Sequence, residues 1–173
     1  MLDLPELIEL DIHAKKQETM EWCWIGCICG IAESVKIASV PSEGELANLA
    51  LGRTDCTHDP VPQDCIVPAP AIETVVVLSK LGITCVGPDA ALAPEALLVE
   101  LLAKQPIMAG LVWPGGGHYT IIRGFRKWTK KFLVSDPFFG DGELSYAEIA
   151  SAYSKGQWMF SYGRFAKVEN SSG

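Results

Sequence analysis

Helical patterns fill the first half of this 173-residue sequence, and strand patterns fill most of the second half. The clearest helix is predicted over residues 22–37, where apolar residues recur three or four positions apart and the first turns are apolar on nearly all sides. The other predicted helices cover residues 43–51, 71–81, 94–104 and 146–153. The predicted strands cover residues 83–86, 106–113, 117–125, 131–136 and 157–168. This segregation favours an α+β fold, with a central helix in the N-terminal half packed on a mostly antiparallel C-terminal sheet, over alternating βαβ units.

Local signals mark the ends of the second helix. Ser42 lies three residues before Glu45, which is the spacing of a capping box, and Gly52 follows the last helical residue. Residues 53–70 hold four prolines and little periodicity. We therefore predict a long loop there, of a length that is uncommon unless the loop is functional or cross-linked.

Length and charge narrow the class of protein. We expect one domain over residues 1–173, with an extended N-terminal arm over residues 1–16 and a frayed tail over residues 169–173. No apolar stretch reaches about 18 residues, and the N-terminus is acidic where a secretory signal is basic, so neither a membrane span nor an ordinary signal peptide is expected. A net charge of −7 makes nucleic acid a poor partner.

Cys23 stands where a nucleophile is favoured, at the start of the predicted central helix. Unpaired backbone N–H groups and the helix dipole stabilise a thiolate at that position. Gln17 lies six residues earlier, close enough for its side-chain amide to point at the same spot as the backbone N–H of Cys23. Two such donors can form an oxyanion hole.

A histidine and an aspartate are predicted to meet across a hairpin. His118 opens a strand after three glycines, so Gly116 and Gly117 leave little bulk to block a substrate from it. Asp136 closes the partner strand, and antiparallel pairing of residues 117–125 with 131–136 returns it beside His118. A carboxylate there can orient the imidazole of a general base.

Together these segments resemble a known family. Gln17 with Cys23 and Trp24, then Gly117-His118-Tyr119, then Asp136-Pro137 are similar to the motifs of papain-like cysteine peptidases. The resemblance is closest to compact bacterial members, namely the peptidase domains of bacteriocin exporters and the papain-like effector proteases of plant pathogens.

The resemblance implies a papain-like fold and acyl-transfer chemistry. In it Cys23 is the nucleophile, His118 the base and Asp136 its orienter, while Gln17 and the Cys23 N–H hold the oxyanion; Trp24 is expected to wall the cleft. It implies a peptide or protein substrate and neither a metal nor an organic cofactor. Location in a bacterial cytoplasm, or secretion without a cleavable signal, is the corresponding expectation. Met20-Glu21-Trp22 departs from the small turn that precedes the nucleophile in papain.

Two alternative functions are compatible with the same residues. An acyltransferase, amidase or deamidase uses the same thioester chemistry with another acceptor or substrate. A binding module on an inactive peptidase scaffold is the second alternative, and the presence of all four functional groups disfavours it.

We interpret the remaining cysteines as structural rather than catalytic. Cys27 and Cys29 suggest a metal site with Cys23, but position 29 points away from position 23 on a helix, so we interpret both as core residues. Cys56 and Cys65, nine residues apart with His58 between them, are compatible with a disulfide, a zinc site or neither. A disulfide is favoured if the protein is exported.

Overall fold

The structure is a computed structural model that describes residues 3–69 and 71–169. Its helices are α1 (Cys23–Ser34), α2 (Glu43–Leu51), α3 (Ala71–Lys80), α4 (Pro94–Leu102) and α5 (Tyr146–Ala150), with a 3-10 turn η1 (Gln63–Cys65). Its strands are β1 (Leu7–Glu9), β2 (Ile83–Asp89), β3 (Ile107–Trp113), β4 (Gly116–Arg126), β5 (Lys131–Asp136), β6 (Gly140–Leu144) and β7 (Gln157–Lys167).

Within the described residues, seven strands form one antiparallel sheet. Its order is β2-β7-β3-β4-β5-β6, and β1 pairs with β4 outside this path. β3 runs beside β4 as far as Ile122, and β1 takes the corresponding place beside residues 124–126. Strand β4 therefore pairs with β1 of the N-terminal arm as well as with β3 and β5.

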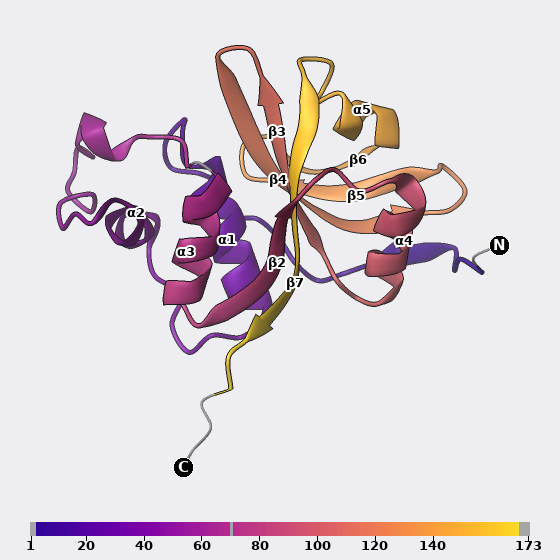
Figure 1. The fold of residues 1–173 in the computed structure, drawn as a ribbon, viewed down its shortest axis with the longest axis horizontal. Helices are drawn as coiled ribbons and strands as arrows, with labels where there is room; N and C mark the ends of the chain where they lie inside the picture. Colours follow the sequence, from indigo (N-terminus) through magenta and orange to yellow (C-terminus); the bar gives the residue numbers. More distant parts are fainter. Residues whose placement is uncertain (1–2, 70, 170–173) are drawn as a thin grey trace.

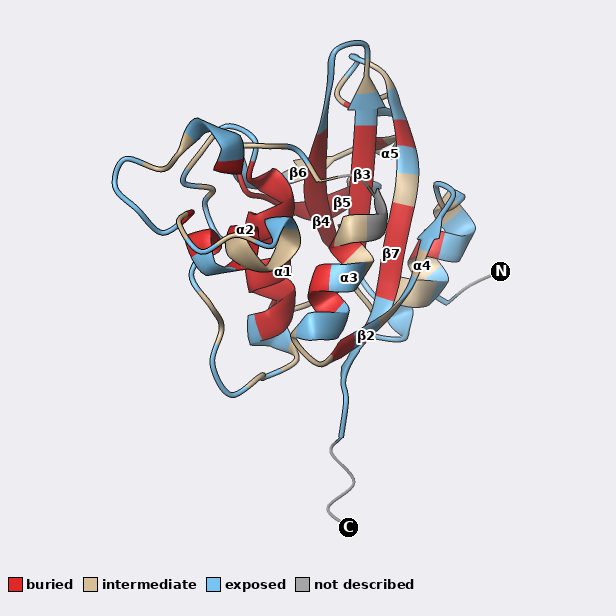
Figure 2. Ribbon diagram, turned by 60° about the vertical axis from the view of Figure 1, so that its left-hand side comes forward, coloured by how far each residue is buried: buried red, intermediate tan, exposed pale blue. Residues whose placement is uncertain are grey.

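Two hydrophobic cores lie on opposite faces of this sheet. Neighbouring strand residues point to opposite faces, so Met108 packs among α1, α2 and α3 while Ile107 and Ala109 pack with α4 and α5. The helical half gathers on one side of the sheet (Figure 1), and the buried residues run through α1 and the central strands (Figure 2). Helix α1 is thus covered on nearly all sides.

The N-terminal arm ties α1 to the end of β5. The Lys15 N–H donates to the carbonyl oxygen of Gly26 in α1 at 2.9 Å. The neighbouring Ala14 N–H donates to the Ser135 hydroxyl at 2.9 Å, and the Gln17 N–H donates to the Pro137 carbonyl at 3.0 Å. The arm therefore joins the element that carries Cys23 to the one that ends in Asp136.

The predicted α+β architecture is confirmed. Ser42 and Glu45 make both hydrogen bonds of a capping box, and Gly52 ends α2 in the left-handed conformation at φ 65°. Strand β6 was not predicted, because its sequence is rich in glycine and charge and it pairs with a single neighbour at the edge of the sheet. The predicted helix over 146–153 is too long, since α5 ends at Ala150.

Three further predictions concern the cysteines, the C-terminal tail and membrane-spanning helices. Cys56 and Cys65 are joined by a disulfide, while Cys27 and Cys29 are buried in the core as free thiols. The expected tail lies outside the described residues from position 170 onward. Among the described residues, no helix has the length and apolar character needed to cross a bilayer.

Candidate active site

Cys23 is the first residue of α1 and is 7% exposed. The helix begins with neither a side-chain cap nor an acidic residue in its first turn, whereas α2 and α5 each begin with a complete capping box. The N–H groups of a first helical turn lack acceptors within the helix. Together with the helix dipole, they favour negative charge beside Cys23.

Two tryptophans fix the start of this helix. The Trp22 indole N–H donates to the Cys65 carbonyl at 2.9 Å, and the Trp24 indole N–H donates to the Val67 carbonyl at 3.3 Å. Both side chains are buried. Trp24 and Cys23 also line a small cavity of about 70 Å³, so Trp24 lies at the wall beside the thiol.

His118 and Asp136 meet across the β4–β5 hairpin. The register pairs Ile121 with Ser135, so Asp136 lies one residue farther along β5 and His118 three residues before Ile121 on β4. The His118 Nε2 and the Asp136 Oδ2 are 2.8 Å apart. The other ring nitrogen, Nδ1, takes no part in this contact, and Cys23 lies near enough to His118 to raise the pKa of the ring.

Asp136 accepts four hydrogen bonds. Its Oδ1 accepts the backbone N–H groups of Phe138 and Phe139 at 2.8 and 2.9 Å. Its Oδ2 is within 2.8 Å of His118 Nε2 and accepts the Tyr153 hydroxyl at 2.8 Å. Both carboxylate oxygens are therefore fixed, in a residue that is 4% exposed.

These contacts set the charges of the pair. Burial opposes the imidazolium, but hydrogen bonds and charge from Asp136 and Cys23 outweigh it and raise the pKa of His118 to about 9. Burial also acts against the Asp136 carboxylate, yet its bonds to His118, Phe139 and Tyr153 lower its pKa. At neutral pH the site favours a protonated ring beside an ionised carboxylate.

Gln17 lies at the cleft with its amide donors engaged. Its Nε2 donates to the carbonyls of Thr19 and Met20 at 2.7 and 2.8 Å. Its Oε1 is buried and has no hydrogen-bond partner among the described residues. An amide nitrogen has two hydrogens, so one of these bonds must open before Gln17 can donate to a substrate.

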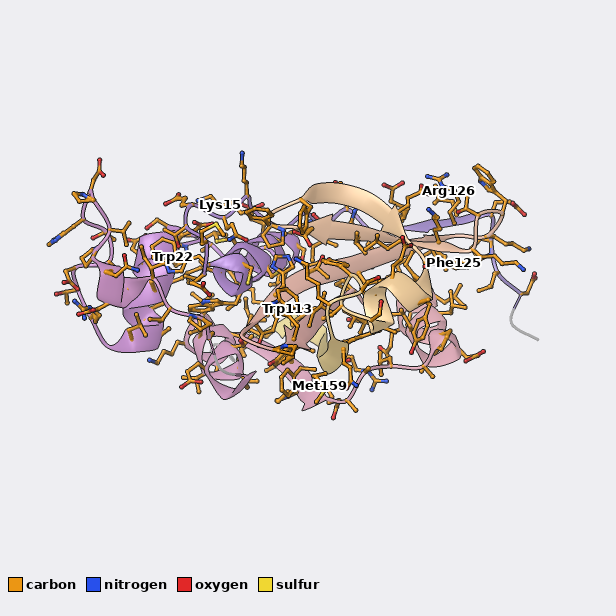
Figure 3. The ribbon with its side chains drawn as sticks, turned by 90° about the horizontal axis from the view of Figure 1, so that it is seen from above. Lys15, Trp22, Trp113, Phe125, Arg126 and Met159 are labelled. Carbon is orange, nitrogen blue, oxygen red and sulfur yellow. A yellow bond between two sulfur atoms is a disulfide. The ribbon has the colours of Figure 1, made fainter. Side chains whose placement is uncertain are left out.

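A cleft of about 720 Å³ runs past His118. Gln17, Gly116, Gly117, His118, Phe138, Phe139, Tyr153 and Lys155 are among the residues that line it. Gly115 closes the β3–β4 turn at φ 81°, a conformation that glycine adopts without strain. The indole of Trp113, from the other side of that turn, also lines the cleft and lies between the helical half and the far end of the sheet (Figure 3).

The structure brings Cys23, His118 and Asp136 together, with Gln17, Gly116 and Gly117 along the adjoining cleft. Sequence reasoning missed Tyr153, because a residue predicted to end a helix gives no signal that it contacts a carboxylate. The only cluster with metal-ligand geometry among the described residues is Asp55, Cys56 and Cys65, and its two sulfurs are bonded to each other.

Two solved structures are similar to this chain. One is a double glycine motif protease from an AMS/PCAT transporter in complex with the leader peptide, with 18% identity, 92% of this chain and 94% of that chain covered, and a TM-score of 0.58. The other is the peptidase domain of Streptococcus mutans ComA, with 12% identity, 88% and 98% covered, and a TM-score of 0.53. At these identities the likeness shows the fold.

A family comparison assigns the chain more closely. The family described as papain-like cysteine protease AvrRpt2 matches residues 6–152, which is most of the chain and includes Cys23, His118 and Asp136. No curated protein matches significantly. The chain therefore belongs to the papain-like cysteine protease family of AvrRpt2 and is a cysteine-type peptidase.

Proposed function

We propose that the protein hydrolyses peptide bonds with Cys23 as nucleophile, His118 as proton carrier and Asp136 as the group that orients His118. The observation that supports this assignment is the 2.8 Å contact between His118 Nε2 and Asp136 Oδ2, which leaves Nδ1 for the thiol. A base held by a third group beside a nucleophile is the general arrangement for acyl transfer.

The reaction runs through a thioester. The Cys23 Sγ attacks the peptide carbonyl carbon, and the carbonyl electron pair moves to oxygen. When the oxyanion collapses, the C–N bond breaks and the leaving amine takes the proton from His118. His118 then removes a proton from water, whose oxygen attacks the thioester; the acid product leaves and the thiolate–imidazolium pair is restored.

The oxyanion is proposed to bind the Cys23 N–H and the Gln17 side-chain amide. The uncapped first turn of α1 supports the first donor. For the second, Gln17 exchanges one of its bonds to the Thr19 and Met20 carbonyls for a bond to the substrate oxygen. We expect Gln17→Ala to lower kcat by about 10²- to 10³-fold, as loss of one such donor does elsewhere.

A peptide is the substrate class that we propose. One of the similar structures is in complex with the leader peptide, and here Gly116 and Gly117 are exposed and line the cleft beside His118. An extended chain passing those glycines would present its carbonyl to Cys23, with Trp24 beside the thiol.

Thiol labelling combined with product analysis tests this function. We would measure iodoacetamide modification against pH by peptide mapping in the parent and in His118→Ala, and incubate both with a peptide library. Rapid labelling of Cys23 at about pH 6, slowed in His118→Ala, together with hydrolysed peptides, is the expected result. Cys29→Ala is the matched control, because burial raises the pKa of that thiol to about 12.

The products separate the alternatives. Transfer of an acyl group or deamidated glutamine without peptide cleavage would replace hydrolysis by the corresponding activity. Ordinary thiol reactivity at Cys23, with no turnover, would overturn the proposal in favour of an inactive binding module.

A further inference from the structure

A phenol shares the Asp136 oxygen that contacts His118. The Tyr153 hydroxyl donates to Asp136 Oδ2 at 2.8 Å, and His118 Nε2 lies 2.8 Å from the same atom. Tyr153 lies one residue beyond the segment that matches the family. This hydrogen bond therefore comes from a residue outside the region of the chain that matches the family.

The backbone around Tyr153 has an unusual conformation, which places its side chain beside Asp136. After α5 and its C-cap residue Ser151, the next three residues, Ala152, Tyr153 and Ser154, all adopt left-handed conformations, with φ of 47°, 60° and 64°. Residues other than glycine rarely adopt this region, and such strain persists only where surrounding contacts impose it. Here the Tyr153 N–H donates to the Glu148 carbonyl at 2.8 Å, and Ala152 is fully buried.

Two aromatic rings lie against His118, that of Tyr153 from this turn and that of Phe139 from the connection between β5 and β6. The ring centroids of Tyr153 and Phe139 each lie 6.2 Å from that of His118 and 6.0 Å from each other. His118 is 8% exposed as a result of this and its other contacts. Low exposure strengthens the charged hydrogen bonds that the carboxylate makes.

The phenol is suited to remain a donor. Burial, followed by the charge of Asp136, raises the pKa of Tyr153 above its usual range, so the hydroxyl keeps its proton. The Phe138 and Phe139 N–H groups hold Oδ1 from the other side. With its second oxygen held by Tyr153, the carboxylate cannot rotate away from His118.

We propose that Tyr153 is a positioning residue for peptide hydrolysis: its hydroxyl locks Asp136 in the orientation that aligns His118 with Cys23. This rests on the proposed function. Tyr153 touches neither the attacking sulfur nor the proton in transit in this scheme, so it acts through Asp136.

Tyr153→Phe tests the proposal, because it removes the hydroxyl and keeps the ring. Loss of a hydrogen bond to a charged group predicts a kcat lowered by about 10- to 100-fold, with KM within about two-fold because the ring still lines the cleft. Iodoacetamide modification of Cys23 at about pH 6 should also slow. Tyr146→Phe is the matched control, since that hydroxyl, on α5, donates to the Leu92 carbonyl instead.

A double-mutant cycle with Asp136→Ala separates positioning from a structural role. If Tyr153 acts through Asp136, Tyr153→Phe has no further effect on kcat in the Asp136→Ala background. An equal loss in both backgrounds, or a kcat for Tyr153→Phe within two-fold of the parent, would overturn the proposal. Cys23→Ala distinguishes failure of the function itself, because residual hydrolysis in that variant would reject Cys23 as nucleophile whatever Tyr153 does.

Discussion

The indole N–H of Trp22 donates to the carbonyl oxygen of Cys65 across 2.9 Å, and this bond ties a disulfide-closed loop to the residue that precedes Cys23. On the other side of Cys23, the indole N–H of Trp24 donates to the carbonyl oxygen of Val67, just beyond the disulfide. The loop that looked irregular in sequence is therefore part of the support for the start of α1.

Removing the disulfide should loosen this support. Closure of a loop of this size is worth about 2–3 kcal/mol in the chain-entropy treatment, so we expect the Cys56→Ala/Cys65→Ala variant to lose about that much free energy of unfolding. Because Cys65 also carries the Trp22 acceptor, kcat should fall as well. Urea unfolding and peptide hydrolysis measure the two effects. Cys85→Ala, which removes a free thiol, is the control, and equal stability in both variants would contradict the prediction.

Gly30 should not tolerate a methyl group, although it lies inside a helix. A Cβ there would overlap the carbonyl oxygen of His13 in the N-terminal arm. Alanine is the better helix former by about 1 kcal/mol, but overpacking typically costs about 1–3 kcal/mol. We expect Gly30→Ala to lower the free energy of unfolding in urea. Gly142→Ala, at a position with open space around it, should change it little, and a stabilised Gly30→Ala would refute the argument.

Local patterns predicted much of the fold. The capping box at Ser42 and the hairpin over 117–136 depend on residues close in sequence, and both are present. Strand β6 was missed because nothing in Gly140–Leu144 alternates between apolar and polar, so its pairing with β5 is a tertiary effect.

Some contacts of the candidate site could be predicted from the sequence, and others could not. The meeting of His118 and Asp136 follows from hairpin register, so it was predictable. The engagement of the Gln17 amide by the Thr19 and Met20 carbonyls was not, because closeness in sequence allows the amide to point either way. The contact of Tyr153 depends on a left-handed turn that no residue preference in that segment indicates.

The pH dependence of hydrolysis should have an alkaline limb set by His118. Hydrogen bonding to Asp136 and Cys23 raises the pKa of His118 to about 9 against the opposing effect of burial. The charged ring's contribution to stability is fully present below about pH 6.5 and is lost as pH rises through about 9. We expect kcat/KM to fall near that upper value. In Asp136→Asn the limb should move to lower pH, and an unmoved limb would exclude Asp136 as its cause.

Glu43 should make folding stability fall between acidic and neutral pH. Its carboxyl is buried beneath the Gln17 segment, where Oε2 accepts the Glu18 N–H at 2.8 Å and Oε1 has no partner among the described residues. Burial outweighs that bond and raises the pKa of Glu43 to about 7. Its contribution is therefore fully present below the ordinary value of about 4.3 and is lost as pH rises through about 7.

Glu43→Gln isolates this effect, because the amide keeps an acceptor for the Glu18 N–H and does not ionise. We expect thermal melts to show the variant gaining Tm relative to the parent as pH rises from about 5 to 8. The exposed Glu45 takes part in a capping box with Ser42 and has a lowered pKa, so Glu45→Gln should show no such gain over that range. A constant Tm difference between Glu43→Gln and the parent would contradict the prediction, because it would mean that Glu43 stays in one protonation state over that range, either protonated through burial or ionised beside Lys15.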